Sequence, residues 1–161
     1  MPTVDTEWSR DLEYFNQVVR SPEVYAQVSD DTSPAPESFS MAKEVADKGN
    51  LFLGVVCDGK PGGFFAFYPL GHGAYEVHTT LTIRGQDALE AGKLAAKRMF
   101  RETPCVALVS ICPEDNRASF VFAKKCGMKL EKEVPQALLK GGKPIPGKVV
   151  SLTIKEWIKC Q

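Results

Sequence analysis

The chain has 161 residues, the length of one ordinary domain, so we expect a single domain over residues 1–161. Hydrophobic residues make up 43% and charged residues 25% of the chain, which is typical of globular proteins and argues against disorder. The 20 basic and 20 acidic side chains cancel. No net field therefore attracts nucleic acid or an anionic membrane, and neither is expected as a partner.

Cysteine usage and the N-terminus bear on metal binding and location. The five cysteines are widely spread without a Cys-x-x-Cys pair, and the chain has two histidines. This pattern indicates reduced thiols, so neither disulfides nor a metal site are expected. The N-terminal run Met-Pro-Thr-Val-Asp-Thr-Glu-Trp lacks the basic and apolar regions of an export signal, and no apolar stretch is long enough for a spanning helix. The expected location is therefore the cytoplasm.

The first expected elements in chain order are helical. Residues 8–28 place apolar side chains at helical spacing until Pro22 interrupts the pattern, which predicts one or two short helices. Residues 29–39 are rich in turn-forming residues and contain two prolines, which predicts a loop. Residues 41–48 predict another short helix, ended by a Gly-Asn pair.

A β-hairpin is expected next. Residues 51–57 form a continuous apolar run typical of a buried strand, and residues 64–68 form an aromatic one. Residues 58–63, Asp-Gly-Lys-Pro-Gly-Gly, provide the turn between them. The sheet is therefore predicted to begin with this antiparallel pair.

The middle of the chain predicts a strand, helix, strand unit. Residues 74–83 are rich in β-branched residues, residues 86–101 have helical spacing, and residues 106–111 form an uninterrupted apolar run. Such a run is typical of a parallel strand covered on both faces, and the crossover is expected to be right-handed.

The C-terminal part completes the expected sheet. Residues 116–126 predict a second helix that ends at Gly127, and residues 149–154 predict a last strand. The predicted fold class is α+β, a mixed and mostly antiparallel sheet with a central βαβ unit and flanking helices.

Two motifs carry a resemblance to a known superfamily. Residues 84–88, Arg-Gly-Gln-Asp-Ala, stand at the strand-to-helix turn, and residues 116–128 contain Asn-Arg-Ala-Ser-Phe-Val-Phe-Ala-Lys-Lys-Cys-Gly-Met. In this order they resemble the two cofactor-binding motifs of the GNAT superfamily of N-acetyltransferases, over roughly residues 50–156. The run at residues 75–81 is similar to a bacteriophage-encoded branch of that superfamily, which would place the protein in the host cytoplasm.

The resemblance implies acetyl-CoA as co-substrate. The loop amides would grip its pyrophosphate, main-chain groups of the central strand would face its pantetheine and thioester, and the later helix would line the pantetheine arm. The cofactor-binding residues implied in this way are Thr79, Thr80, Leu81, Arg84, Gly85, Gln86, Asp87, Ala88, Asn116 and Phe122.

Physical chemistry supports the loop assignment independently of the family. A helix N-terminus offers unsatisfied amides and a partial positive charge, and Gly85 would let a diphosphate approach the backbone. Arg84 can add a charge-assisted contact, or can be a solvated cation at an ordinary turn. Asn116 can bond pantetheine amides, or can simply cap its helix.

Three positions depart from the family pattern. Asp87 stands where a glycine is expected, and Leu89 stands where glycine or alanine is expected. A carboxylate at residue 87 would repel a diphosphate unless it points outward. Ala123 occupies the place of the tyrosine that many members use as general acid, and its methyl group cannot donate a proton.

Two catalytic residues are predicted on the central strand. Strand alternation puts Glu76, His78 and Thr80 on one face. His78 is the natural base at neutral pH, and Glu76 can orient it or act as the base itself. The alternative is a polar pair without a catalytic role. His72, between two glycines, is expected in an exposed turn.

We therefore expect an N-acetyltransferase that uses acetyl-CoA and an unidentified amine acceptor. One alternative is a degenerate GNAT-fold protein that serves as a binding, inhibitor or assembly protein, and another is an unrelated α+β binding module. A homodimer is left open. Cys112 and Cys126 are expected to be small core residues, not nucleophiles.

Overall fold

The computed structural model describes residues 2–161. The strands are β1 (Val4–Trp8), β2 (Leu51–Cys57), β3 (Lys60–Gly71), β4 (Ala74–Leu81), β5 (Ala107–Pro113), β6 (Lys129–Lys140) and β7 (Lys143–Thr153). The helices are α1 (Leu12–Arg20), α2 (Pro22–Val28), α3 (Ala42–Ala46), α4 (Gly85–Glu102), α5 (Arg117–Lys125) and α6 (Ile154–Lys159), with one short 3-10 turn, η1 (Pro36–Ser38).

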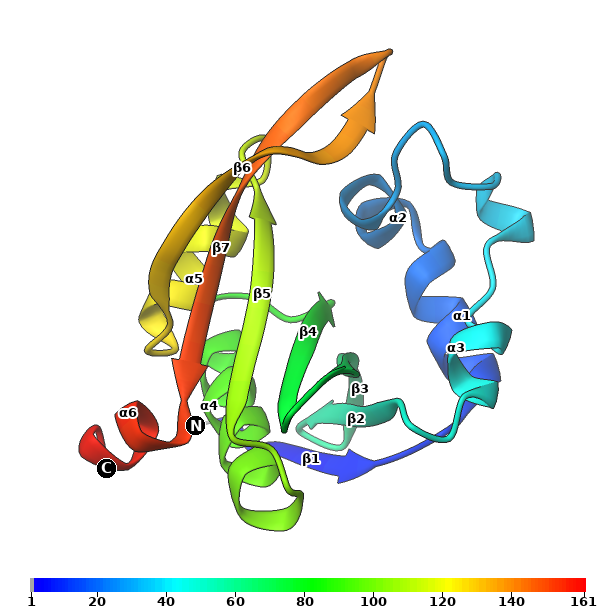
Figure 1. The fold of residues 1–161 in the computed structure, drawn as a ribbon. Coiled ribbons are helices and arrows are strands. Elements are labelled where there is room, and N and C mark those ends of the chain that lie inside the picture. The colour runs from blue at the N-terminus through cyan, green and yellow to red at the C-terminus, as the bar shows by residue number, and fades with distance from the viewer. Residues whose placement is uncertain (1) are drawn as a thin grey trace.

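The strands form one seven-stranded sheet in the order β1-β2-β3-β4-β5-β7-β6. Every neighbouring pair is antiparallel except β4 and β5, which are parallel and joined by α4. Figure 1 shows α1, α2 and α3 gathered on one side of the N-terminal strands, with α4 and α5 on the other side of the sheet. The predicted fold class, including the central βαβ unit, is confirmed.

Alternation along the β2–β3 hairpin creates two hydrophobic cores. Phe64 and Ala66 pack with Phe15 of α1 in one core, whereas Phe65 and Phe67 pack under α4 in the other. All of these side chains are buried. Because successive side chains of a strand point to opposite faces, one aromatic run holds helices on both sides of the sheet.

The N-terminal segment differs from the prediction. Residues 4–8 form an edge strand that pairs antiparallel with β2. The sheet therefore does not begin with the β2–β3 hairpin, and Trp8 is not helical. Helix α1 begins at Leu12, because the side chain of Asp11 caps it by accepting a hydrogen bond from the amide of Tyr14 (3.1 Å). The prediction of one or two short helices with a break at Pro22 is confirmed, and the structure has two.

The C-terminal part of the sheet is also larger than the sequence predicted. Strand β6 was not predicted, and β7 begins at Lys143 instead of residue 149. Strand β6 is a charged edge strand whose pairing is irregular between Val134 and Leu138, around Pro135, and edge strands tolerate proline. The pairing of β5 with β7 begins only at Gly147, so the prolines at the start of β7 lie beyond β5.

Strand β5 is less covered than its apolar sequence predicted. It pairs in parallel with β4 through three residue pairs, from Ala74↔Ala107 to Glu76↔Val109, and its other neighbour is the antiparallel β7. Ile111, beyond the parallel pairs, is 43% exposed. The prediction of a strand covered on both faces is therefore wrong at Ile111, where β5 has parted from β4.

Candidate functional site

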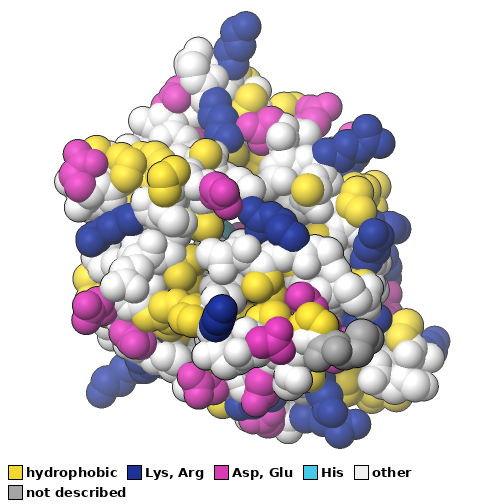
Figure 2. Space-filling view, turned by 180° about the vertical axis from the view of Figure 1, so that it is seen from behind, with side chains coloured by type: hydrophobic (Ala, Val, Ile, Leu, Met, Phe, Trp, Pro, Cys, Tyr) yellow, Lys and Arg dark blue, Asp and Glu magenta, His cyan; other side chains and the backbone are white. Residues whose placement is uncertain are grey.

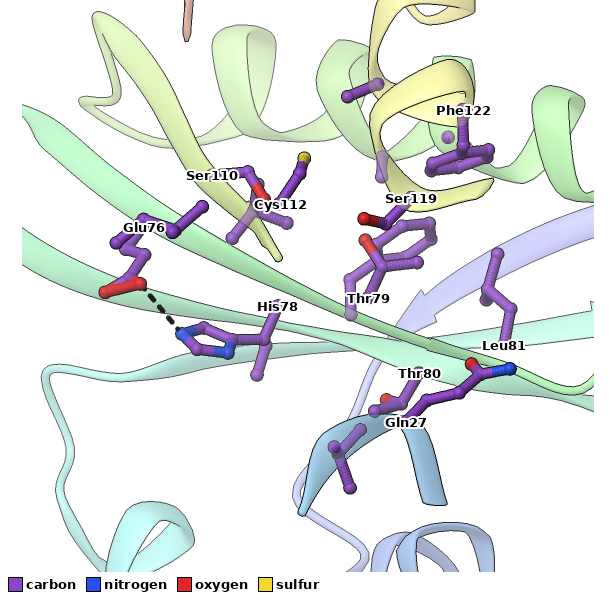
Figure 3. Close-up of a pocket in the computed structure, with 18 of the residues that line it drawn as sticks. Gln27, Glu76, His78, Thr79, Thr80, Leu81, Ser110, Cys112, Ser119 and Phe122 are labelled. Atoms are coloured by element: carbon purple, nitrogen blue, oxygen red, sulfur yellow. Dashed lines mark ion pairs between the residues drawn. The ribbon is translucent and has the colours of Figure 1, made fainter. Parts of the chain in front are cut away.

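A cavity of about 700 Å³ lies where β4 and β5 part. It reaches from the face covered by α1, α2 and α3 to the face covered by α4 and α5, and β4 contributes side chains to both ends (Figure 3). Residues 76–81 of β4 all line it. The parting of two parallel neighbours therefore opens the sheet instead of leaving a solid core.

Glu76 and His78 meet on one side of this cavity. The Nε2 atom of His78 lies 3.1 Å from the Oε2 atom of Glu76, as the dashed line in Figure 3 marks. The His78 side chain is 51% exposed, whereas that of Glu76 is 25% exposed. The hydrogen bond from His78 lowers the pKa of Glu76 despite its partial burial. The structure thus brings together the two predicted catalytic side chains.

Tyr68 completes this side of the cavity. Its ring packs edge-on against the His78 ring, with the centroids 5.0 Å apart. Burial raises the pKa of Tyr68, and the nearby carboxylates of Glu44 and Glu76 raise it further. The phenol is therefore neutral at physiological pH. Tyr68 and Glu44 line the cavity but were not predicted as site residues.

The C-terminal end of β4 also borders the cavity. The hydroxyl of Thr80 is buried and donates a hydrogen bond to the carbonyl oxygen of Phe64 (2.8 Å), so this side chain is already engaged. Thr79 and Leu81 also line the cavity. Because β4 has no paired residue on β5 beyond Glu76 in the described chain, its main-chain groups on that flank are open to a ligand.

The N-terminus of α4 opens at Gly85. This residue has a φ of +63°, and an added Cβ would meet no atom within 4 Å, so the space above the helix end is free. The guanidinium of Arg84 folds back onto the carbonyl oxygens of Leu81 (2.9 Å) and Ile83 (3.2 Å). Both Arg84 and Gly85 line the cavity.

The next three predicted loop residues do not line the cavity. They are Gln86, Asp87 and Ala88, and the side chain of Ala88 is buried in the core on the inner face of α4. The Asp87 carboxylate is 3.8 Å from the thiol of Cys57, which donates to it. Asp87 is thus directed at β2, which relieves the charge conflict that the sequence suggested. The backbone amides of this first turn have no intrahelical acceptor and remain available to an anion.

Helix α5 brings Asn116, Ser119 and Phe122 to the cavity wall. The side chain of Asn116 caps the helix by accepting from the amide of Ser119 (3.3 Å), so the capping alternative is realised at a residue that also faces the cavity. The hydroxyl of Ser119 donates to the carbonyl oxygen of Asn116 (2.8 Å). Ser119 was missed because the family pattern drew attention to Ala123, one turn later and buried.

Close approach of α4 and α5 fixes this wall. An added Cβ at Gly92 of α4 would lie 2.8 Å from Cζ of Phe122 and 2.6 Å from Sγ of Cys126. Burial raises the pKa of the Cys126 thiol to about 11 and also raises that of Cys112, which lines the cavity as well. Both thiols are therefore protonated. Cys112 is a buried core residue as predicted, whereas Cys126 is only partly buried.

The loop after α2 and the tip of the β6–β7 hairpin are joined. Asp31 accepts hydrogen bonds from the amides of Gly141 (2.9 Å) and Gly142 (2.8 Å), and Asp30 accepts one from Leu139 (3.1 Å). Leu138, next to these contacts, lines the cavity. The predicted loop is thus fastened to the C-terminal hairpin next to residues that line the cavity.

Other site types find no support among the described residues. In residues 2–161, no group of three or more His, Cys, Asp or Glu side chains could hold a metal ion. None of the helices in that range is long and apolar enough to cross a membrane. Figure 2 shows basic and acidic side chains intermixed on the face seen there. His72 has a φ of +54° in the exposed β3–β4 turn, as predicted.

No model of a known family and no curated protein matches this sequence. Solved structures do match it. A probable acetyltransferase of the GNAT family from Chromobacterium violaceum has a TM-score of 0.76 and 21% identity, covering 96% of this chain and 85% of its own. RimL, a ribosomal alpha-N-protein acetyltransferase in complex with coenzyme A, has a TM-score of 0.74 and 17% identity, covering 96% of both chains.

The spermidine N-acetyltransferase of Vibrio cholerae, in complex with CoA and spermine, has a TM-score of 0.75 and 12% identity over 98% of both chains. This chain has the GNAT fold. In the GNAT fold observed here, the implied cofactor motifs at residues 84–88 and 116–128 begin α4 and span α5. Identities this low carry the fold and not the activity, and the bacteriophage origin and the cytoplasmic location stay predictions.

Proposed function

We propose that the protein is an acetyl-CoA-dependent N-acetyltransferase acting on an amine. The observation that carries the proposal is the continuous cavity between β4 and β5, which connects the open helix end at Gly85 with the Glu76–His78 pair. A thioester entering from one face and an amine entering from the other would meet beside β4. The GNAT fold and its CoA-bound relatives support this assignment.

The residues present fit coenzyme A. The free space at Gly85 and the first-turn amides of α4 suit a diphosphate, because both the amides and the helix dipole favour an anion. The open main-chain flank of Thr79, Thr80 and Leu81 offers donors and acceptors to the pantetheine amides. Phe122 and Asn116 bound the same space from α5.

In the proposed reaction, His78 accepts a proton from the attacking amine, directly or through a water, and Glu76 holds the imidazole in place. The amine nitrogen forms a bond to the thioester carbon, and the carbon–sulfur bond breaks. The leaving thiolate must then be protonated. Ala123 cannot do this, and we assign the role to the hydroxyl of Ser119, which lines the cavity one turn earlier on α5. This hydroxyl would turn from the carbonyl oxygen of Asn116 to the thiolate and would take a proton back from water.

A thermal shift measurement tests cofactor binding. A ligand that binds only the folded state at a hundredfold excess over Kd stabilises it by about 2.7 kcal/mol, or roughly 5 to 10 °C for a domain of this size. We expect this shift with acetyl-CoA, a similar or smaller one with CoA, and none with adenosine alone. Folded, ligand-free protein that shows no shift at millimolar acetyl-CoA would contradict the proposal.

Turnover on a panel of amines then separates an enzyme from a degenerate GNAT-fold protein. Release of free CoA thiol with at least one amine supports the enzyme. Tight acetyl-CoA binding without turnover on any amine would favour the non-catalytic alternative, for which the missing hydroxyl at Ala123 is the specific argument.

A further inference from the structure

A buried carboxylate oxygen without a partner lies at the acceptor end of the cavity. Glu44, on α3, lines the cavity, and its Oε2 atom is buried with no hydrogen-bond partner in residues 2–161. No cationic side chain in that range forms an ion pair with Glu44. Leaving a buried anionic oxygen unpaired is costly, so the site favours a ligand that brings a positive charge to it.

Arg10 and Arg20 are engaged with backbone carbonyl oxygens near this end of the cavity. The guanidinium of Arg10 donates to the carbonyl oxygens of Asn50 (2.8 Å) and Asp47 (2.8 Å), and that of Arg20 donates to the carbonyl oxygen of Phe39 (2.6 Å). These side chains hold loops in place and do not neutralise Glu44. Of the acidic and basic side chains that line the cavity, Glu44 and Glu76 are anionic and Arg84 is cationic, and the Arg84 guanidinium is bonded to the carbonyl oxygens of Leu81 and Ile83 at the start of α4.

Tyr68 connects this carboxylate to the reaction site. Both Glu44 and Glu76 lie close enough to its phenol to raise its pKa, and its ring contacts His78. Two carboxylates and one aromatic ring thus face the same end of the cavity. An ammonium group is attracted both by the carboxylates and by the face of an aromatic ring.

The lining contributed by the N-terminal helices, the loop after them and the hairpin tip is mostly apolar. It includes Val19 of α1, Val28 of α2, Phe39, Met41 and Leu138, with Gln27 of α2 as a polar side chain. A methylene chain fits such a wall, whereas a charged or strongly polar body would lose hydration there without compensation. The walls thus combine one anionic anchor with an apolar passage.

We propose that the acceptor is a compact diamine, with its second ammonium group bound at Glu44 while its first amine reacts beside Glu76 and His78. This inference rests on the proposed function and specifies its substrate class. The charged end fixes the position of the molecule, the methylene chain lies along the apolar wall, and His78 receives the proton of the reacting amine.

The test compares diamines with monoamines of equal length. The probes are 1,3-diaminopropane, 1,4-diaminobutane and 1,5-diaminopentane, with propylamine, butylamine and pentylamine as partners. We expect kcat/KM for the best diamine to exceed that of its monoamine at least tenfold. Glu44→Gln, which keeps the shape and removes the charge, should lower this ratio at least tenfold. Glu37→Gln, an exposed carboxylate outside the cavity, is the matched control and should leave it unchanged.

Calorimetric titration of the diamine into protein without acetyl-CoA gives a second readout. We expect binding to the wild type and to Glu37→Gln, and at least tenfold weaker binding to Glu44→Gln. Turnover with equal preference for both amine types, or a preference that survives Glu44→Gln, would overturn the diamine assignment and leave the acetyltransferase proposal intact. Diamine binding that depends on Glu44 without turnover of any amine would contradict the acetyltransferase proposal and support the ammonium site alone.

Discussion

Asp31 and Gly142 are 111 positions apart in the chain, yet the carboxylate of one accepts a hydrogen bond of 2.8 Å from the backbone amide of the other. The amide of Gly141 donates to the same carboxylate. This contact ties the loop after α2 to the β6–β7 hairpin (Figure 1). Val28, Phe39 and Leu138, which flank the two joined segments, line the cavity, so the contact supports that part of its wall.

Asp31→Ala is expected to loosen the acceptor end. Each lost hydrogen bond is worth about 1 kcal/mol or less at this exposed position, so the fold should survive. The KM for the acceptor should rise severalfold, with the Kd for acetyl-CoA unchanged, because Gly85 and the main-chain flank of β4 are not touched. Steady-state kinetics with Glu37→Ala as control measures this. An unchanged acceptor KM would show that the contact has no role in binding.

Gly85→Val is expected to weaken acyl-CoA binding at least tenfold. A side chain at this position would enter the space above the N-terminus of α4, where the diphosphate is proposed to bind. A β-branched residue at a φ of +63° also strains the backbone, by about 1–2 kcal/mol. Gly71→Val is the matched control. Gly71 also has a positive φ and no atom within 4 Å of an added Cβ, but it lies at the end of β3, before β4, whereas Gly85 follows β4.

Calorimetric titration with CoA measures both variants. Equal loss of affinity in Gly71→Val and Gly85→Val would assign the effect to general destabilisation. Equal affinity in Gly85→Val and wild type would place the diphosphate elsewhere on the molecule.

His78→Ala is expected to lower kcat about a hundredfold while acetyl-CoA affinity stays near that of the wild type. The hydrogen bond from His78 lowers the pKa of Glu76, which makes Glu76 a weaker base than an ordinary carboxylate. Removing His78 removes that effect, so Glu76 would become a better base in the variant. Turnover that is unchanged or higher in His78→Ala would therefore remove His78 from the mechanism and leave Glu76 as the base to be tested. The measurement is kcat as a function of pH for both proteins.

Glu156→Gln is expected to destabilise the protein at neutral pH and progressively less in acid. Glu156 and Thr153 form a capping box at α6, and Lys129 lies 2.9 Å from the carboxylate. The backbone of Thr153 and then Lys129 lower the pKa of Glu156 to about 2. Since the folded pKa is depressed, the stabilisation is fully present above the ordinary value of 4.5 and is lost as pH falls toward 2.

Melting temperatures of Glu156→Gln and wild type should therefore differ at pH 7 and converge between pH 4.5 and pH 2. Glu114→Gln, at an exposed position, serves as control and should follow the wild type throughout. A difference that stays constant across this pH range would rule out ionisation of Glu156 as its source.

Local patterns predicted the elements whose partners lie close in sequence. The β2–β3 hairpin, the β4–α4–β5 unit and α5 follow from periodicity, turns and caps. Strands β1 and β6 were missed because they are short or charged edge strands, and their pairing depends on contacts that no local pattern encodes. An edge strand needs only one neighbour, so its sequence carries a weak signal.

The residues of the candidate site also divide into those that a local pattern predicted and those that only the tertiary fold brings together. Glu76 and His78 are two positions apart on one strand, so alternation alone predicted their contact. Glu44 and Tyr68 come from α3 and β3, and only the tertiary fold directs them to the same cavity. In the sequence Glu44 reads as an ordinary charge on a short helix, and Tyr68 as the end of an aromatic core run.

The parallel pairing of β4 and β5 covers only three residue pairs, and beyond them the two strands are not paired with each other. Backbone amides within the junction, at Ala74 to Glu76, should exchange slowly with solvent deuterium, while those on the facing edges beyond it should exchange quickly. A bound pantetheine chain would occupy the place of the strand that is missing there. The bound cofactor would then supply the hydrogen-bond partners that a neighbouring strand normally provides. Protein without the cofactor would have an unpaired strand edge in the middle of its sheet.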